Sequence, residues 1–207
     1  MKIIKELFDK NGYYIAKNIF KKSDMSSLFM MFYDISYSTA KRNKIKIYSQ
    51  LPSPNNVIYP NDMKKLDKLM LEIFNFNKDL IGEIYDTISF SSVFLRFTAS
   101  KKIEKISKIL LGVKKYTQLY GFTNRIRIDP PNDERRTYGW HQEIFYTLPK
   151  SKFVQTWCPI LRDTTKQNGT IEIKPFFHKE GITKQTWNEF EGRATQIIID
   201  PRILNKY

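Results

Sequence analysis

A histidine and a glutamate two residues apart are the side chains best suited to metal chemistry in this sequence. The chain contains only two histidines, and one of them lies in Trp140-His141-Gln142-Glu143. In an extended strand, His141 and Glu143 point to one face, and Trp140 and Gln142 point to the other. Such a pair supplies two of the three ligands of the facial triad that holds iron(II) and leaves coordination positions open. The same spacing also fits an ordinary strand pair in which the histidine and the glutamate simply contact each other.

Three further side chains are candidates for binding a co-substrate. Arg125 and Arg127 alternate with isoleucines, so both should lie on one face of a strand, where they could pair with a carboxylate. The alternative is that this face meets solvent. Trp157 lies in a second apolar run and either lines the co-substrate pocket or packs in the core.

The order of several motifs resembles that of a known enzyme family. The motifs lie at residues 12–20, 124–131, 140–143, 154–160, 168–173 and 175–181. This arrangement is similar to the phytanoyl-CoA dioxygenase family, in which a W-H-x-D motif is followed by a N-G turn and a P-G-S-H-K-x-G motif. The resemblance implies a double-stranded β-helix, or jelly roll, that binds iron(II) and uses 2-oxoglutarate and oxygen to hydroxylate a small molecule.

The resemblance assigns roles to individual residues. It makes His141 and Glu143 iron ligands, although the position of Glu143 is usually aspartate in the family. His178 matches the histidine of the P-G-S-H-K turn, which is not an iron ligand there and organises a loop. The alternative is that His178 serves as a substitute iron ligand in this chain. In this chain Phe176 and Phe177 replace the usual glycine and serine of that turn.

Two functional residues of the family have no counterpart in this chain. The second ligand histidine and the arginine that binds 2-oxoglutarate would follow the 175–181 motif by some tens of residues, whereas the chain stops at Tyr207. We therefore expect a jelly roll that lacks its last strands. The chain is then a truncated product, a relic without turnover that binds a ligand or partner, or a protein completed by a partner chain. Missing strands would leave sheet edges exposed, and we expect association through those edges.

The elements around these motifs fall into a helical part and a strand-rich part of one domain, residues 1–207. Apolar residues recur every three or four positions before residue 115, which predicts helices at 25–37, from Asn61 or Asp62, after Asn77, and at 100–111. After residue 116 the pattern becomes strand-like, at 117–129, 140–148, 153–161, 170–174 and 194–199. Together the two parts predict an α+β fold in which N-terminal helices flank the incomplete, cupin-like jelly roll.

Composition limits the remaining classes of function. The 207 residues carry a formal net charge of +14, which favours an anionic small-molecule substrate. Nucleic-acid binding is the weaker explanation, because the charge is spread along the chain and no nucleic-acid-binding motif is present. No run of apolar residues is long enough to span a membrane. One cysteine, Cys158, and no signal-peptide pattern favour the cytoplasm.

Overall fold

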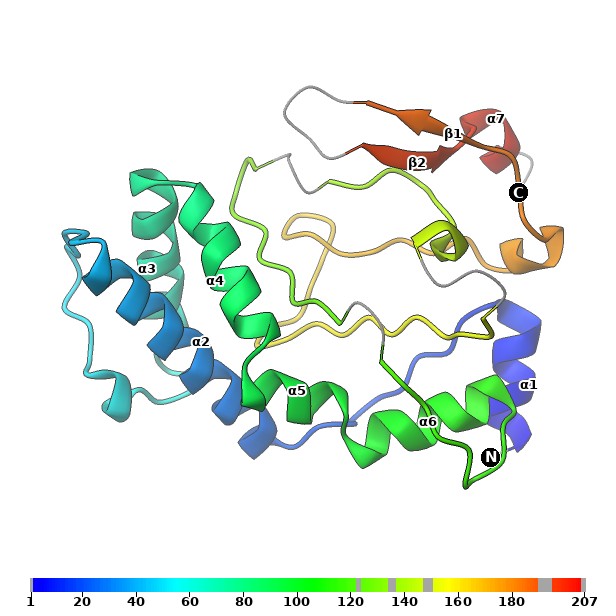
Figure 1. Ribbon diagram of the computed structural model, residues 1–207, viewed down its shortest axis with the longest axis horizontal. Helices are drawn as coiled ribbons and strands as arrows, with labels where there is room; N and C mark the ends of the chain where they lie inside the picture. Colours follow the sequence, from blue (N-terminus) through cyan, green and yellow to red (C-terminus); the bar gives the residue numbers. More distant parts are fainter. Residues whose placement is uncertain (1, 122–123, 134–136, 147–150, 190–194, 206–207) are drawn as a thin grey trace.

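Helices make up most of the first half of the chain in the computed structural model. The structure describes residues 2–121, 124–133, 137–146, 151–189 and 195–205. Figure 1 shows the order of the elements along the chain. The described α-helices before residue 115 are α1 (Lys2–Asn11), α2 (Lys22–Arg42), α3 (Met63–Phe76), α4 (Asp79–Ser89), α5 (Ser92–Thr98) and α6 (Lys101–Leu111), with a short 3-10 helix η1 (Pro54–Asn56) between α2 and α3.

Local signals decide where several of these helices begin and end. The Ser100 hydroxyl accepts a hydrogen bond from the backbone N–H of Ile103, and Gly112 ends α6 with a left-handed φ of 63°. Ser91 caps α5 in the same way by accepting from the N–H of Phe94. The helices predicted after Asp62 and Asn77 and from Ser100 to Leu111 are confirmed. Helix α2 is longer than predicted, and α1 and α5 were not predicted.

The hydrophobic core lies almost entirely among helices α2, α3, α4 and α5. These four helices contact one another, and α1 packs separately against α6. Each contributes apolar side chains to this core, and Phe29, Tyr33, Ile73 and Ile84 are fully buried. Ile126 is the residue between 117 and 129 that is buried in this core.

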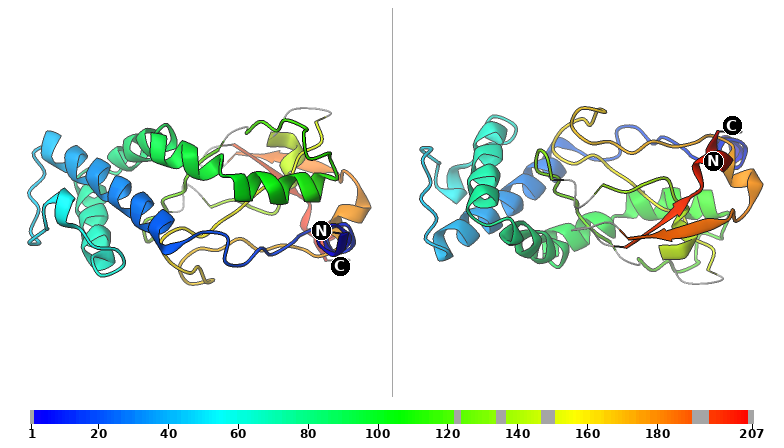
Figure 2. Two further views of the ribbon diagram at one scale, coloured as in Figure 1. Left: turned by 90° about the horizontal axis from the view of Figure 1, so that it is seen from below. Right: turned by 90° about the horizontal axis from the view of Figure 1, so that it is seen from above.

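The second half of the chain contains little regular structure. It has the 3-10 helices η3 (Glu143–Tyr146) and η4 (Phe177–Glu180), the strands β1 (Gln185–Asn188) and β2 (Gln196–Ile199), and the short helix α7 (Pro201–Leu204). The two strands pair antiparallel, with Gln185 opposite Ile199 and Asn188 opposite Gln196. Figure 2 shows this hairpin and α1 at one end of an elongated molecule, with α2 and α3 at the other.

The predicted jelly roll is wrong. In the described part of the chain, β1 and β2 form a two-stranded sheet and no further strand joins it. Of the five predicted strands, only 194–199 overlaps an observed strand; residues 194 and 147–148 lie outside the described residues. The segments 117–121, 124–129, 153–161 and 170–174 are neither helix nor strand, and Figure 1 shows 153–174 as irregular yellow and orange traces.

The physical reason is that a strand needs a partner. An apolar–polar alternation states which residues share a face, but a ladder forms only where two such segments exchange backbone hydrogen bonds. Gln185–Asn188 and Gln196–Ile199 do so because they are the arms of one hairpin. β1 was not among the predicted strands.

No described helix is both long enough and apolar enough to cross a membrane.

Candidate functional site

His141 and Glu143 lie in contact, as their spacing predicts. The Nε2 atom of His141 is 3.3 Å from Oε1 of Glu143, and their side chains are 23% and 36% exposed. Glu143 is the first residue of η3 rather than part of a strand. The two donors therefore converge without the strand geometry from which their convergence was predicted.

The hydrogen bonds of the imidazole fix which nitrogen faces Glu143. His141 Nδ1 lies 2.7 Å from the carbonyl oxygen of Gly139, so Nδ1–H donates to that carbonyl. In a neutral ring this leaves the lone pair of Nε2 facing the Glu143 carboxylate. Two acceptors face each other only if a positive charge lies between them, and either a proton or a metal ion fits that description. The hydrogen bond to Glu143 raises the pKa of His141, and burial opposes that shift.

Strand β2 holds the segment that carries this pair. The Gln196 side chain is 2% exposed. Its amide donates to the carbonyl of Thr137 at 2.6 Å, and its oxygen accepts from the N–H of Gly139 at 3.0 Å. Gln196 therefore positions the backbone of Gly139, whose carbonyl in turn orients His141.

Two further hydrogen bonds join the same segment to β2. The N–H of Ile199 donates to the carbonyl of Trp140 at 2.7 Å, and the N–H of Ile197 donates to the Tyr146 hydroxyl at 3.0 Å. The segment 137–146 thus accepts hydrogen bonds from backbone N–H groups along one edge of the hairpin. Association through exposed sheet edges remains a prediction for the edge of β1.

Gln142 fixes the other side of the segment. Its side-chain oxygen accepts from the N–H of Thr183 at 3.0 Å and from the Gln185 amide at 3.0 Å. Its amide group donates to the carbonyl of Gly181 at 2.7 Å. The residue between the two candidate ligands therefore binds the segment that leads into β1.

Two aromatic rings lie close to the imidazole. Tyr146 meets the His141 ring edge-on with centroids 5.3 Å apart, and Tyr138 lies 5.9 Å away. The Arg127 guanidinium lies 5.5 Å from the Tyr138 ring, and Arg127 also pairs with Asp129 at 2.9 Å. The structure thus connects Arg127 to the pair through Tyr138.

Arg125 and Trp157 lie elsewhere. Arg125 lies over the Tyr85 ring of α4 and 3.6 Å from Asp86, both on the helical half. Trp157 is 38% exposed, and within the described ranges no hydrogen bond or ring contact links it to His141 or Glu143. The structure does not bring these two candidates to the pair.

His178 has a structural partner. Its Nε2 lies 2.9 Å from the carbonyl oxygen of Asp9, at the end of α1. Its ring packs on Gly12 so closely that a Cβ there would lie 2.4 Å from Nδ1. This arrangement ties the turn at 176–181 to the N-terminal helix, in agreement with a loop-organising role.

The donor set of the pair meets part of the requirement of an iron site. His141 and Glu143 fit two ligand positions, one nitrogen and one carboxylate oxygen. Among residues that the structure describes, no third histidine, cysteine or carboxylate joins them. A third protein ligand would have to come from outside the described residues.

Sequence reasoning missed the supporting residues Gln196, Tyr138 and Tyr146. Gln196 did leave a signal, because it is a polar residue at the start of the apolar run Gln196-Ile197-Ile198-Ile199. A polar residue in such a run is typically hydrogen-bonded when buried. Its partners, however, lie more than fifty residues earlier, and no local pattern identifies them.

Comparison with known proteins adds no relative. No family model matches the chain, and neither a curated protein nor a solved structure is significantly similar to it.

Proposed function

We propose that this protein is an iron(II)- and 2-oxoglutarate-dependent oxygenase that holds its metal through His141 and Glu143. The observation that carries the proposal is the approach of His141 Nε2 to Glu143 Oε1, with Nδ1–H donated to the carbonyl of Gly139. That hydrogen bond leaves Nε2 as the coordinating nitrogen. Imidazole and carboxylate are also suitable ligands for iron(II).

The surrounding residues would orient and shield the metal. Gly139 and Gln196 set the direction of the imidazole, and the rings of Tyr138 and Tyr146 lie next to it. If iron(II) were held by this pair, it would bind 2-oxoglutarate and oxygen, so that oxygen could oxidise 2-oxoglutarate to succinate and carbon dioxide and hydroxylate the substrate. Arg127, which lies over the Tyr138 ring and pairs with Asp129, is a candidate for attracting a carboxylate towards this region.

The substrate that we propose is a small organic anion, in keeping with the net charge of +14. We propose a cytoplasmic location, which the unpaired thiol of Cys158 supports.

A non-catalytic protein that binds a ligand is the second candidate. It is favoured by the finding that no third ligand joins the pair in the described part of the chain. Succinate production separates the two. An oxygenase converts 2-oxoglutarate to succinate when iron(II) and oxygen are supplied, whereas a binding protein does not.

The test of metal binding is an anaerobic titration with iron(II) followed by 2-oxoglutarate. The readout is the visible charge-transfer band of the iron–2-oxoglutarate chelate. We expect a saturable band at one iron per chain that is lost in His141→Ala and strongly weakened in Glu143→Gln.

The matched control is His178→Ala, which removes the other histidine. It should keep the band, because His178 binds the carbonyl of Asp9 rather than the pair. Circular dichroism checks that every variant is folded. Absence of a band in folded protein, or a band that persists in His141→Ala, would show that the pair is bridged by a proton instead of a metal.

A further inference from the structure

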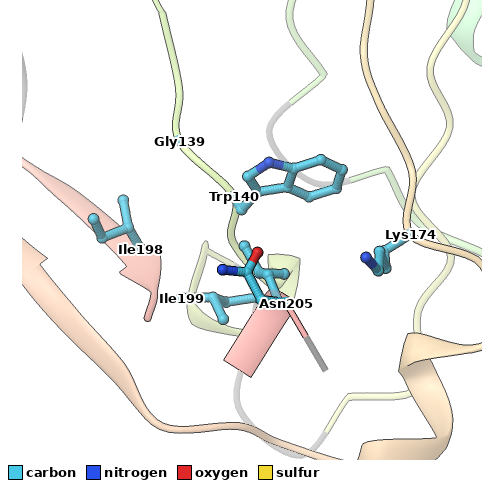
Figure 3. Close-up of a pocket in the computed structure, with 7 residues that line it drawn as sticks. Gly139, Trp140, Lys174, Ile198, Ile199 and Asn205 are labelled. Carbon is cyan, nitrogen blue, oxygen red and sulfur yellow. The ribbon is translucent and has the colours of Figure 1, made fainter. Parts of the chain in front are cut away.

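A pocket opens beside the metal-binding segment. It has a volume of about 400 Å³, within the range of small-molecule sites. Figure 3 shows the side chains that surround it. The lining residues come from the site segment, the segment before η4, the end of β2 and the C-terminal helix: Gly139, Trp140, Lys174, Ile198, Ile199, Leu204 and Asn205.

The walls combine a flat aromatic surface, an apolar surface and one positive charge. Trp140 contributes an indole that is 39% exposed. Ile198 and Ile199 supply aliphatic surface, and Asn205 supplies an amide. Lys174 also lines the pocket, and in Figure 3 the nitrogen of its side chain lies on the side nearer Trp140 and Asn205.

Lys174 has no opposing charge within the described ranges. The ion pairs found there involve other basic residues, and no carboxylate lies within 4.0 Å of Lys174 Nζ. Among the lining residues that the structure describes, none is acidic. A half-buried ammonium group beside an apolar surface is suited to the acidic group of a ligand.

The pocket wall is held in place by backbone contacts. The carbonyl of Trp140 accepts from the N–H of Ile199 at 2.7 Å, which fixes the indole-bearing residue to the end of β2. A Cβ on Gly139 would lie 3.0 Å from Cγ2 of Ile198. Glycine at this position therefore allows the segment to lie close against β2, and the wall needs little ordering when a ligand binds.

We propose that this pocket binds a small organic anion with a flat, apolar body. The body lies on Trp140 and the isoleucines, the acidic group pairs with Lys174, and Asn205 donates a further hydrogen bond. This binding uses none of the metal ligands. It goes beyond the oxygenase proposal and is tested in metal-free protein, so either proposal can fail without the other.

The experiment titrates chelator-treated protein with 2-naphthoate and with the neutral 2-naphthamide, by calorimetry and tryptophan fluorescence. We expect naphthoate to bind at one site per chain and up to about fivefold more tightly than the amide, as one partly exposed ion pair contributes. Lys174→Met should abolish this preference for the anion. Trp140→Leu should weaken both probes.

Lys105→Met is the matched control, because Lys105 is an exposed lysine on α6, away from the pocket. It should bind both probes as the parent does. The proposal is overturned if naphthoate does not bind at millimolar concentration, if acid and amide bind equally, or if Lys105→Met and Lys174→Met have the same effect. Lys174→Arg, which keeps the charge, should retain the preference and provides a second readout if Lys174→Met is poorly folded.

Discussion

Replacing Gln196 with leucine should loosen the segment that carries His141 and Glu143 while keeping the volume of the buried side chain. Gln196 is 2% exposed and makes two hydrogen bonds, to the carbonyl of Thr137 and from the N–H of Gly139. Leucine makes neither. Both partners, Thr137 and Gly139, are exposed residues, so water can replace part of each hydrogen bond. The loss of each bond should therefore cost about 1 kcal/mol, at the lower end of the range for losing a hydrogen-bond partner. We therefore expect Gln196→Leu to lower the free energy of unfolding by about 2 kcal/mol.

The same substitution should weaken metal binding without touching a ligand. Gly139 orients His141 through its carbonyl group, and loss of such an outer partner typically costs about tenfold in metal affinity. Urea unfolding measures the stability, and anaerobic iron(II) titration measures the affinity. Gln167→Leu, at an exposed glutamine outside this network, should change stability by less than about 0.5 kcal/mol. If Gln196→Leu matched that control in both measurements, β2 would not be the support of the site.

Three other predictions concern the fold. Ile84 is fully buried in α4, so Ile84→Ala should destabilise the protein by about 2–5 kcal/mol in urea unfolding, and a loss below about 1 kcal/mol would contradict the helical core. Gly12 has a φ of 84° and abuts His178, so Gly12→Ala should cost at least about 1 kcal/mol; an unchanged denaturation midpoint would refute the contact between α1 and the 176–181 turn. The hydrogen bond from Lys65 lowers the pKa of the Asp62 carboxyl in the folded protein. The ionised Asp62 carboxylate therefore stabilises the fold fully above its unfolded pKa of about 4, and this stabilisation is lost as the pH falls through its lower pKa in the folded state. The stability difference between the parent and Asp62→Asn, followed by urea unfolding from pH 7 to pH 2, should therefore shrink below about pH 4, and a constant difference would contradict this.

The helices could be predicted because their signals are local. Ser100 and Gly112 mark the two ends of α6 in the sequence, and both act as caps in the structure. The jelly roll could not be predicted reliably, because alternation along 153–161 or 170–174 does not state whether a partner strand exists. Pairing is a property of two segments, and the described pairing is that of β1 with β2.

In the candidate site, too, the local contact could be predicted from the sequence and the long-range support could not. The contact between His141 and Glu143 followed from a spacing of two residues and was predicted, although the backbone there is not a strand. The support from Gln196 joins segments more than fifty residues apart and left only a weak signal. The alternation of Arg125 and Arg127 with isoleucines predicts that both lie on one face, but it does not state what that face meets. Arg125 lies beside Asp86 of α4 rather than at the pair.

The most direct test of the metal site is iron K-edge X-ray absorption of the iron(II)-loaded protein. We predict scattering from a single imidazole, since His141 is the proposed ligand and His178 binds the carbonyl of Asp9. This imidazole signal should vanish in His141→Ala and persist in His178→Ala. Iron surrounded by oxygen ligands alone, or an imidazole signal that follows His178, would contradict the assignment of His141 and Glu143 as the metal-binding pair.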